Sequence, residues 1–327
     1  MMLETERENS INMKNRTING IAMLCFFLIT SLVSCKKEDV SLQSNTALED
    51  TEPFENPTFD VEPTLVDNPY SADASASANT VSMDATATAT YVRKNLIFNF
   101  NAETSTSLTY FRNNSLTSWA FKQKCCSYSQ QRSTAYARSG SYSTRYELNK
   151  YDADVFGSKR TETGRYTRSE PYAKVERWYG ASYYLPSDFV YDAAAESPTQ
   201  WHTTSTRYPP LALWIQKGQW RLVQFGNLST VLGTYDKGKW TDFVFHVKWS
   251  SGTDGLLEVW KNGVKIFSKA GKNINAGITY GAYMRSGLYK WPWKSGSTST
   301  TTKRVLYIDD VRIGNASATY NDVVPGL

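Results

Sequence analysis

The sequence predicts a nearly all-β domain of about 237 residues, beginning near position 91. Short runs rich in aromatic and β-branched residues recur along this part of the chain, and turn residues separate them. No convincing 3.6-residue apolar period accompanies them, so helices are not expected. A chain of this length suits one β-sandwich or barrel.

Eight segments carry the strand pattern. In order they are 95–100, 143–148, 176–185, 210–215, 219–225, 240–249, 255–267 and 304–314. Lys261-Asn262-Gly263 divides the seventh segment into two apolar runs, and Asn-Gly between such runs is a strong signal for a β-hairpin.

Two antiparallel sheets stacked face to face would form a β-jelly roll, and a curved pair would offer a concave groove for a long ligand. Ten tryptophans and 21 tyrosines suit such a groove, because aromatic faces cover sugar rings while polar tips form hydrogen bonds. Packing in the core is the competing explanation for most of them.

Residues 1–35 read as a lipoprotein signal peptide. Met13 is the expected initiator, and a basic start after it precedes an apolar run at 21–33 that is too short for a stable membrane anchor. The run ends at Cys35 in a sequence that resembles the lipobox of bacterial lipoproteins, so Cys35 is the expected lipidation site. An ordinary secretory leader is the alternative.

Residues 36–90 are predicted to be a disordered, acidic tether rich in Ser, Thr and Ala. Its first residues, Lys36 to Asp39, resemble the charged export signals of surface lipoproteins. We therefore expect a surface-exposed protein, bound to the outer membrane through its N-terminal lipid only.

The net charge differs in sign between the N-terminal 90 residues and the domain at 91–327. Residues 1–90 contain five Lys and Arg against 14 Asp and Glu, whereas residues 91–327 contain 31 against 17. A basic domain favours polyanionic partners, and an exported protein rarely meets nucleic acid. An acidic polysaccharide is therefore the expected partner, and nucleic acid is not.

The cysteines of the domain predict no disulfide framework and no zinc site. Cys125 and Cys126 are adjacent, which makes a bridge between them difficult.

Candidate chemistry lies on three predicted strands whose alternation places polar side chains on one face. Gln200 and His202 flank Trp201 on the first strand. The other two strands carry Arg145 and Glu147, and Tyr283, Arg285, Gly287 and Tyr289. A glycine at position 287 would leave room for a ligand to approach. The second histidine, His246, is expected to be structural.

These motifs, with "RYPPLALW" and "LYIDDVRIG", resemble the heparin lyase I type of polysaccharide lyase and its ulvan and glucuronan lyase relatives. Jelly-roll alginate lyases show a similar trio, with R-x-E-L, Q-x-H and Y-x-K-x-G-x-Y strands. The resemblance covers residues 95 to 325 and implies a concanavalin A-like sandwich. Arg285 stands where relatives often carry lysine, which keeps the charge and changes its geometry.

The resemblance implies β-elimination at a uronic acid. Donors must stabilise the charge that develops on the uronate carboxylate, and Arg145 and Gln200 fit that role. His202 would remove the C5 proton and Tyr289 would protonate the leaving O4. Where both atoms lie on one side of the ring, Tyr289 would do both, helped by a cation such as Arg285.

Further substrate contacts are expected from Arg207, Arg285 and Tyr283. The resemblance also implies a structural Ca²⁺ with Asp309 as ligand, and solvated acids at the end of a strand are the alternative. No cofactor for catalysis is expected, and neither is a catalytic transition metal.

The sequence therefore predicts a monomeric, endo-acting lyase for a uronic-acid polysaccharide, with sulfated ulvan preferred over heparin-like glycans, glucuronan and alginate. A non-catalytic glycan-binding lipoprotein is the second hypothesis. A glycoside hydrolase is a third, and it would need a carboxylate pair such as Glu147 and Glu258.

Overall fold

The computed structural model describes residues 91–104, 119–165, 175–203, 208–278, 282–296 and 299–326. The predicted signal peptide with Cys35, the tether at 36–90, and Arg207 lie outside these residues. No helix in the described ranges is long and apolar enough to cross a membrane.

Almost every regular element is a β-strand. The first eight are β1 (Leu96–Phe100), β2 (Phe121–Gln123), β3 (Gln130–Ser133), β4 (Ser143–Asn149), β5 (Arg160–Arg165), β6 (Glu176–Tyr184), β7 (Glu196–His202) and β8 (Leu211–Gln216). The others are β9 (Gln219–Gln224), β10 (Leu228–Thr234), β11 (Trp240–Lys248), β12 (Leu256–Lys261), β13 (Val264–Ala270), β14 (Tyr283–Tyr289) and β15 (Lys303–Gly314). Three one-turn helices complete the described elements: η2 (Ser127–Ser129), η3 (Trp291–Trp293) and α1 (Tyr320–Val323).

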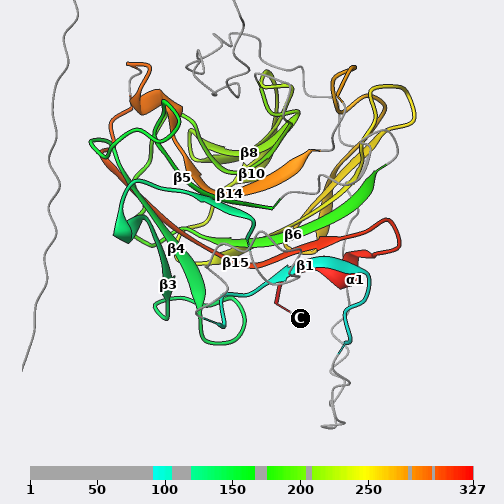
Figure 1. Cartoon of the computed structure of the whole chain (residues 1–327), viewed down its shortest axis with the longest axis horizontal. Helices are drawn as coiled ribbons and strands as arrows, with labels where there is room; N and C mark the ends of the chain where they lie inside the picture. The colour runs from blue at the N-terminus through cyan, green and yellow to red at the C-terminus, as the bar shows by residue number, and fades with distance from the viewer. Residues whose placement is uncertain are drawn as a thin grey trace, which may run out of the picture. The chain divides into compact units, whose positions relative to one another are not determined.

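The strands form two antiparallel sheets packed as a sandwich (Figure 1). One, the back sheet, has the order β13-β12-β11-β6-β15-β4-β3, and β1 pairs with the end of β15. The other, the front sheet, has the order β10-β9-β8-β7-β14-β5-β2. Neighbours such as β6 and β15 are far apart in sequence, which is typical of a jelly roll. The prediction of an all-β jelly roll is confirmed.

Alternation along the strands fills the space between the sheets. The Tyr146 hydroxyl on β4 lies 2.7 Å from Thr163 Oγ1 on β5, and the Tyr183 hydroxyl on β6 lies 2.6 Å from Thr199 Oγ1 on β7. Both hydrogen bonds cross from the back sheet to the front sheet. Burial raises the pKa of both tyrosines well above the usual range, so they stay neutral and hydrogen-bonded.

All eight predicted segments coincide with strands, and 255–267 divides into β12 and β13. Asn262 and Gly263 have φ angles of 49° and 87°, the positive values that a tight hairpin turn between twisted strands requires. The hairpin prediction is confirmed.

The first and last described segments meet on the outer face of the back sheet. Helix α1 covers this face, where Val323 packs in one cluster with Val244 of β11. Asp322 of the helix accepts hydrogen bonds from the Tyr91 hydroxyl at 3.0 Å and the Lys94 amide at 2.8 Å. The chain therefore enters the sandwich on the side away from the front sheet (Figure 1).

A buried ionic network joins the two sheets near the end of β14. Lys290 Nζ lies 3.0 Å from Asp192 Oδ2 and 3.4 Å from Glu196 Oε2. Arg304 of the back sheet donates from Nε to Glu196 of the front sheet at 2.7 Å. All four side chains are buried, so each charge depends on its partner. The network fixes the strand end that carries Tyr289.

Asp192 makes part of this network sensitive to acid. Burial alone would raise the pKa of Asp192, but hydrogen bonds from Ser299 and Thr301 and the charge of Lys290 outweigh it and lower the pKa to about 2. A depressed folded-state pKa contributes stability above the ordinary pKa, and this contribution is lost as the pH falls towards 2.

We therefore expect Asp192→Asn to lower the free energy of unfolding by about 2 kcal/mol at neutral pH, with the difference shrinking below about pH 4. Urea unfolding at a series of pH values measures both effects. Asp188→Asn, at an exposed carboxylate, is the matched control and should stay near wild type. A deficit in Asp192→Asn that persisted unchanged at pH 2 would contradict the assignment.

Candidate functional site

The outer face of the front sheet gathers the predicted site residues of β7 and β14, which are neighbouring strands. Trp201 points into the core, so Gln200 and His202 on either side of it point outward. On β14, Arg285 lies opposite Gln200 and Tyr283 lies opposite His202. The structure therefore places these four side chains on one surface.

Strand β5 adds two residues that the sequence analysis missed. Arg160 pairs with Tyr289 of β14, and Glu162 pairs with Gly287. The segment reads Arg-Thr-Glu-Thr-Gly-Arg and contains no large apolar residue, so it gave no strand signal, yet all six positions are buried. The available signal was a second Arg-x-Glu, of the same spacing as at 145–147.

Glu162 lies at the centre of the site. Its Oε1 accepts a hydrogen bond from Gln200 Nε2 at 2.7 Å, which reaches across β14. Its Oε2 lies 3.6 Å from Arg160 NH1 and 4.0 Å from Arg285 NH1. The carboxylate is only 1% exposed. Two guanidinium groups around one carboxylate leave a net positive charge, which suits an anionic ligand.

Tyr289 and His202 flank this centre on opposite sides. Each is two residues along its strand from a central residue, Gly287 or Gln200, a spacing of about 7 Å. The guanidinium of Arg160 lies 4.3 Å from the centroid of the Tyr289 ring. A positive charge therefore lies beside the phenol ring.

His202 has a defined tautomer. Its Nδ1 lies 2.6 Å from the backbone oxygen of Thr203, which can only accept, so Nδ1 carries a hydrogen and, in the neutral ring, Nε2 carries the lone pair. The ring lies 6.0 Å from that of Tyr283, whose hydroxyl accepts a hydrogen bond from Arg285 at 2.5 Å. In its neutral form this tautomer can accept a proton only at Nε2.

Arg145 does not join the site, and the prediction that it shares a face with His202 and Tyr289 is wrong. It lies on β4 of the back sheet, where its neighbour Tyr146 points into the core. Arg145 therefore projects from the opposite side of the sandwich, where it pairs with Glu147. The strand periodicity was right, but sequence could not show which sheet β4 would join.

Gly287 has a backbone role that the sequence analysis did not predict. Its φ is 147°, a value that residues with side chains rarely adopt. A Cβ there would lie 2.1 Å from the Thr161 backbone oxygen and 2.8 Å from the Glu162 Cα. The packing of β14 against β5 therefore requires glycine at this position, and the approach of a ligand over it stays a prediction.

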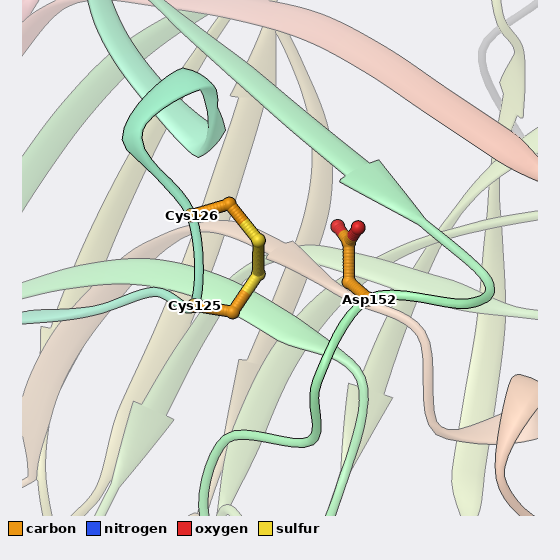
Figure 2. Close-up of side chains that lie close together, drawn as sticks. All are labelled: Cys125, Cys126 and Asp152. Atoms are coloured by element: carbon orange, nitrogen blue, oxygen red, sulfur yellow. A yellow bond between two sulfur atoms is a disulfide. The ribbon is translucent and has the colours of Figure 1, made fainter.

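The structure joins Cys125 and Cys126 in a disulfide, although a bridge between such neighbours was expected to be difficult (Figure 2). Asp152 lies beside them, and the three form the one cluster of potential metal ligands in the described ranges. Disulfide sulfurs are not thiolates, so this cluster does not fit a metal while the bridge is closed.

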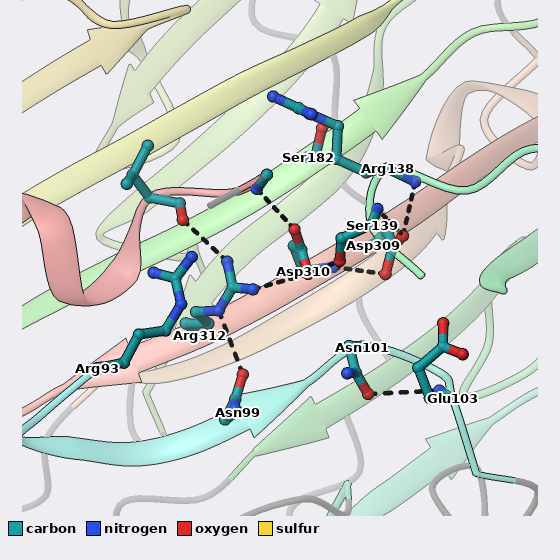
Figure 3. A network of polar contacts seen from close by, with 12 residues as sticks. Arg93, Asn99, Asn101, Glu103, Arg138, Ser139, Ser182, Asp309, Asp310 and Arg312 are labelled. Atoms are coloured by element: carbon teal, nitrogen blue, oxygen red, sulfur yellow. Dashed lines mark hydrogen bonds and ion pairs between the residues drawn. The ribbon is translucent and has the colours of Figure 1, made fainter. Parts of the chain in front are cut away.

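The surroundings of Asp309 do not fit calcium. Its Oδ2 accepts hydrogen bonds from the Arg138 and Ser139 amides at 2.8 and 3.3 Å, and its Oδ1 accepts one from the Asp310 amide at 2.7 Å (Figure 3). The neighbouring Asp310 also has a donor: Arg312 NH2 donates a hydrogen bond to Asp310 Oδ1 at 2.8 Å. Donors fill the positions where calcium needs oxygen ligands. Burial, with the nearby charge of Asp310, raises the pKa of Asp309 to about 7.

The acids considered for a hydrolase lie on the back sheet and do not form a pair. Glu147 on β4 and Glu258 on β12 are four strands apart, about 19 Å, whereas hydrolase carboxylates lie within about 10 Å. Glu258 instead accepts from His246 at 2.8 Å, and His246 also contacts Glu176 at 2.6 Å. These contacts suit the structural role predicted for His246.

The two-sheet sandwich carries basic, amide, imidazole and phenol groups on one outer face. This combination places the protein in the class of jelly-roll polysaccharide lyases. The family model described as "Polysaccharide lyase" matches residues 106–312, and the chain belongs to that family. This confirms the class that the sequence motifs predicted.

One solved structure shares the fold, and a second is a weaker likeness. The endo-β-1,4-glucuronan lyase of the fungus Trichoderma reesei is 20% identical, with a TM-score of 0.53 over 64% of this chain and 94% of that one. The alginate lyase Aly36B is 11% identical, with a TM-score of 0.47 over 68% of this chain and 98% of that one. No curated protein sequence matches the chain.

We expect Gly287→Ala to destabilise the protein by about 2 kcal/mol or more, because the added Cβ strains the backbone and collides with β5. Thermal or urea unfolding measures the loss. Gly252→Ala is the matched control, since the nearest atoms to its Cβ lie at 3.6 Å. Equal stability of the two variants would show that β14 does not need glycine at position 287.

Proposed function

We propose that this protein is an endo-acting lyase that cleaves a uronic-acid polysaccharide by β-elimination. The observation that carries the proposal is the cluster of Gln200, Arg160 and Arg285 around Glu162, with His202 and Tyr289 on its two sides. A buried cationic centre between two proton-transfer groups matches the requirements of this reaction.

The cationic centre would bind the uronate carboxylate. The C5 proton of a uronate is weakly acidic, and its removal places further negative charge on the carboxyl group. Arg160, Arg285 and the Gln200 amide are held in place by Glu162, so little reorganisation is needed when this charge develops. In this proposal Arg160 takes the role that the sequence analysis gave to Arg145.

In this proposal the two flanking groups transfer the proton. His202 Nε2 takes the C5 proton, the electron pair of that bond forms the C4=C5 double bond, and the C4–O4 bond breaks. Tyr289 gives its hydroxyl proton to O4. This route suits a uronate whose C5 proton and O4 lie on opposite faces of the ring. For a uronate with both on one face, Tyr289 would serve as base and acid, with Arg160 favouring its phenolate.

Sulfated ulvan is the first substrate in this proposal. The excess of 31 Lys and Arg over 17 Asp and Glu in residues 91–327 favours a polymer with a high density of acid groups. Glucuronan, the polymer in the name of the T. reesei lyase, is a runner-up, with heparin-like glycans and alginate. We further propose a monomer that needs no organic cofactor, anchored to the outer membrane by a lipid at Cys35.

The direct test is the ultraviolet absorbance of the new double bond, recorded while the protein is incubated with ulvan, glucuronan, alginate and heparin. We expect a rise with at least one polymer. Tyr289→Phe should lower the rate about 100-fold or more, because the phenol proton is lost while the ring stays. His202→Ala should do the same on an opposite-face uronate.

Full activity of Tyr289→Phe on the best polymer would refute the assignment of this residue. Binding without any rise in absorbance, by the wild-type protein and with every polymer, would favour the glycan-binding lipoprotein instead.

The two Arg-x-Glu strands provide a second test. Arg160→Gln should lower kcat/KM about 100-fold, because it removes one cation from the carboxylate site. Arg145→Gln removes the same charge from the opposite side of the sandwich, and its ion pair with Glu147 is partly exposed, so activity should stay within about twofold. A large loss of activity in Arg145→Gln, with little loss in Arg160→Gln, would show that the active site lies at β4 and not at β5.

A further inference from the structure

The outer face of the front sheet extends beyond the centre at Glu162, across β7 and β8 to β9. Trp214 of β8 and Arg221 of β9 are paired residues. Their neighbours Leu213, Trp220 and Leu222 belong to the core, so both side chains project from the same outer face as Tyr289.

Packed aromatic rings fix the position of this region relative to Tyr289. The Tyr289 and Trp291 ring centroids lie 5.2 Å apart, and those of Trp291 and Trp214 lie 4.8 Å apart. All three rings are buried, so β8 and the neighbouring β9 are held rigidly beside the proposed catalytic residue. The separation of Arg221 from Tyr289 is therefore a fixed property of the fold.

Neutral groups orient Arg221. Its Nε donates to Ser229 Oγ at 2.8 Å and its NH1 donates to Gln219 Oε1 at 2.9 Å. No carboxylate in the described ranges forms an ion pair with it, in contrast to Arg138 and Arg304, which face Asp242 and Glu196. Arg221 is half-buried, and burial lowers its pKa from the ordinary value. The result is a directed positive charge that no acid of the described protein neutralises.

We propose that Arg221, held by Gln219 and Ser229, binds the acid group of a sugar unit other than the one that is cleaved. Arg221 lies three strands from Tyr289, about 14 Å, which is more than the width of one pyranose ring. The ligand is a carboxylate or a sulfate ester, since a guanidinium binds either through paired N–H donors. This inference rests on the proposed function, because it assumes that an acidic polymer crosses the front sheet.

The test measures binding in a Tyr289→Phe background, so that cleavage does not alter the polymer. Arg221→Gln should weaken the affinity for an acidic polymer about tenfold, and the loss should shrink as the salt concentration rises. Lys265→Gln removes one charge from the outer edge of the back sheet and should change the affinity less than twofold. Arg221→Lys should restore part of the affinity.

Two polymers identify the acid group. A loss of affinity for non-sulfated glucuronan as well as for ulvan assigns Arg221 to a carboxylate, and a loss with ulvan alone assigns it to a sulfate ester. Unchanged affinity of Arg221→Gln for both polymers, with normal thermal unfolding, overturns the proposal, and so does an equal loss in Lys265→Gln.

The binding measurement is independent of the lyase assay. If the wild-type protein cleaved no polymer but Arg221→Gln still bound tenfold more weakly, the proposed lyase reaction would fail and the acid-binding site would stand.

Discussion

A single buried carboxylate, Glu162, organises the front face of this protein. It meets a glutamine from β7, an arginine from β14 and a second arginine from its own strand. Two buried guanidinium groups so close together would repel each other without it, and desolvation would add to the cost. Glu162 therefore allows a concentrated positive charge inside a folded sheet, and the same contacts aim that charge at a ligand.

Behind this surface, two independent contact sets keep the strands in register. Hydrogen bonds between tyrosine and threonine side chains join the sheets within the core. The network of Lys290, Asp192, Glu196 and Arg304 joins them again at the end of β14. Each set satisfies polar groups that would otherwise be costly to bury. A rigid support of this kind suits a site in which groups from three strands must keep their spacing.

The sequence predicted the strands in which apolar and polar side chains alternate. It did not predict the strand whose polar side chains are buried because they bind one another. The aromatic strands were visible because apolar residues at every second position predict one buried face. Strand β5 is just as buried, but it is almost wholly polar, and only the fold shows that Glu162 meets Gln200. Arg145 shows the complementary limit. Its strand was placed correctly, whereas the sheet to which a strand belongs depends on pairings between distant segments.

Gly287 and the two cysteines show the limit of side-chain patterns. The β14 motif marks Gly287 as special, and the structure shows that its positive φ and the close approach of β5 both require glycine. Adjacent cysteines are difficult to bridge, and the structure nevertheless joins Cys125 and Cys126 in a disulfide. A side-chain pattern reports neither the φ angle nor this pairing.

The contacts of Asp322 with Tyr91 and Lys94 determine on which face of the sandwich the domain begins. They fix the beginning of the domain to the outer face of the back sheet, whereas Glu162 and its partners lie on the opposite pole. The first described residues are therefore held on the face opposite the proposed site, so the entry of the chain does not compete with a polymer for the surface around Glu162.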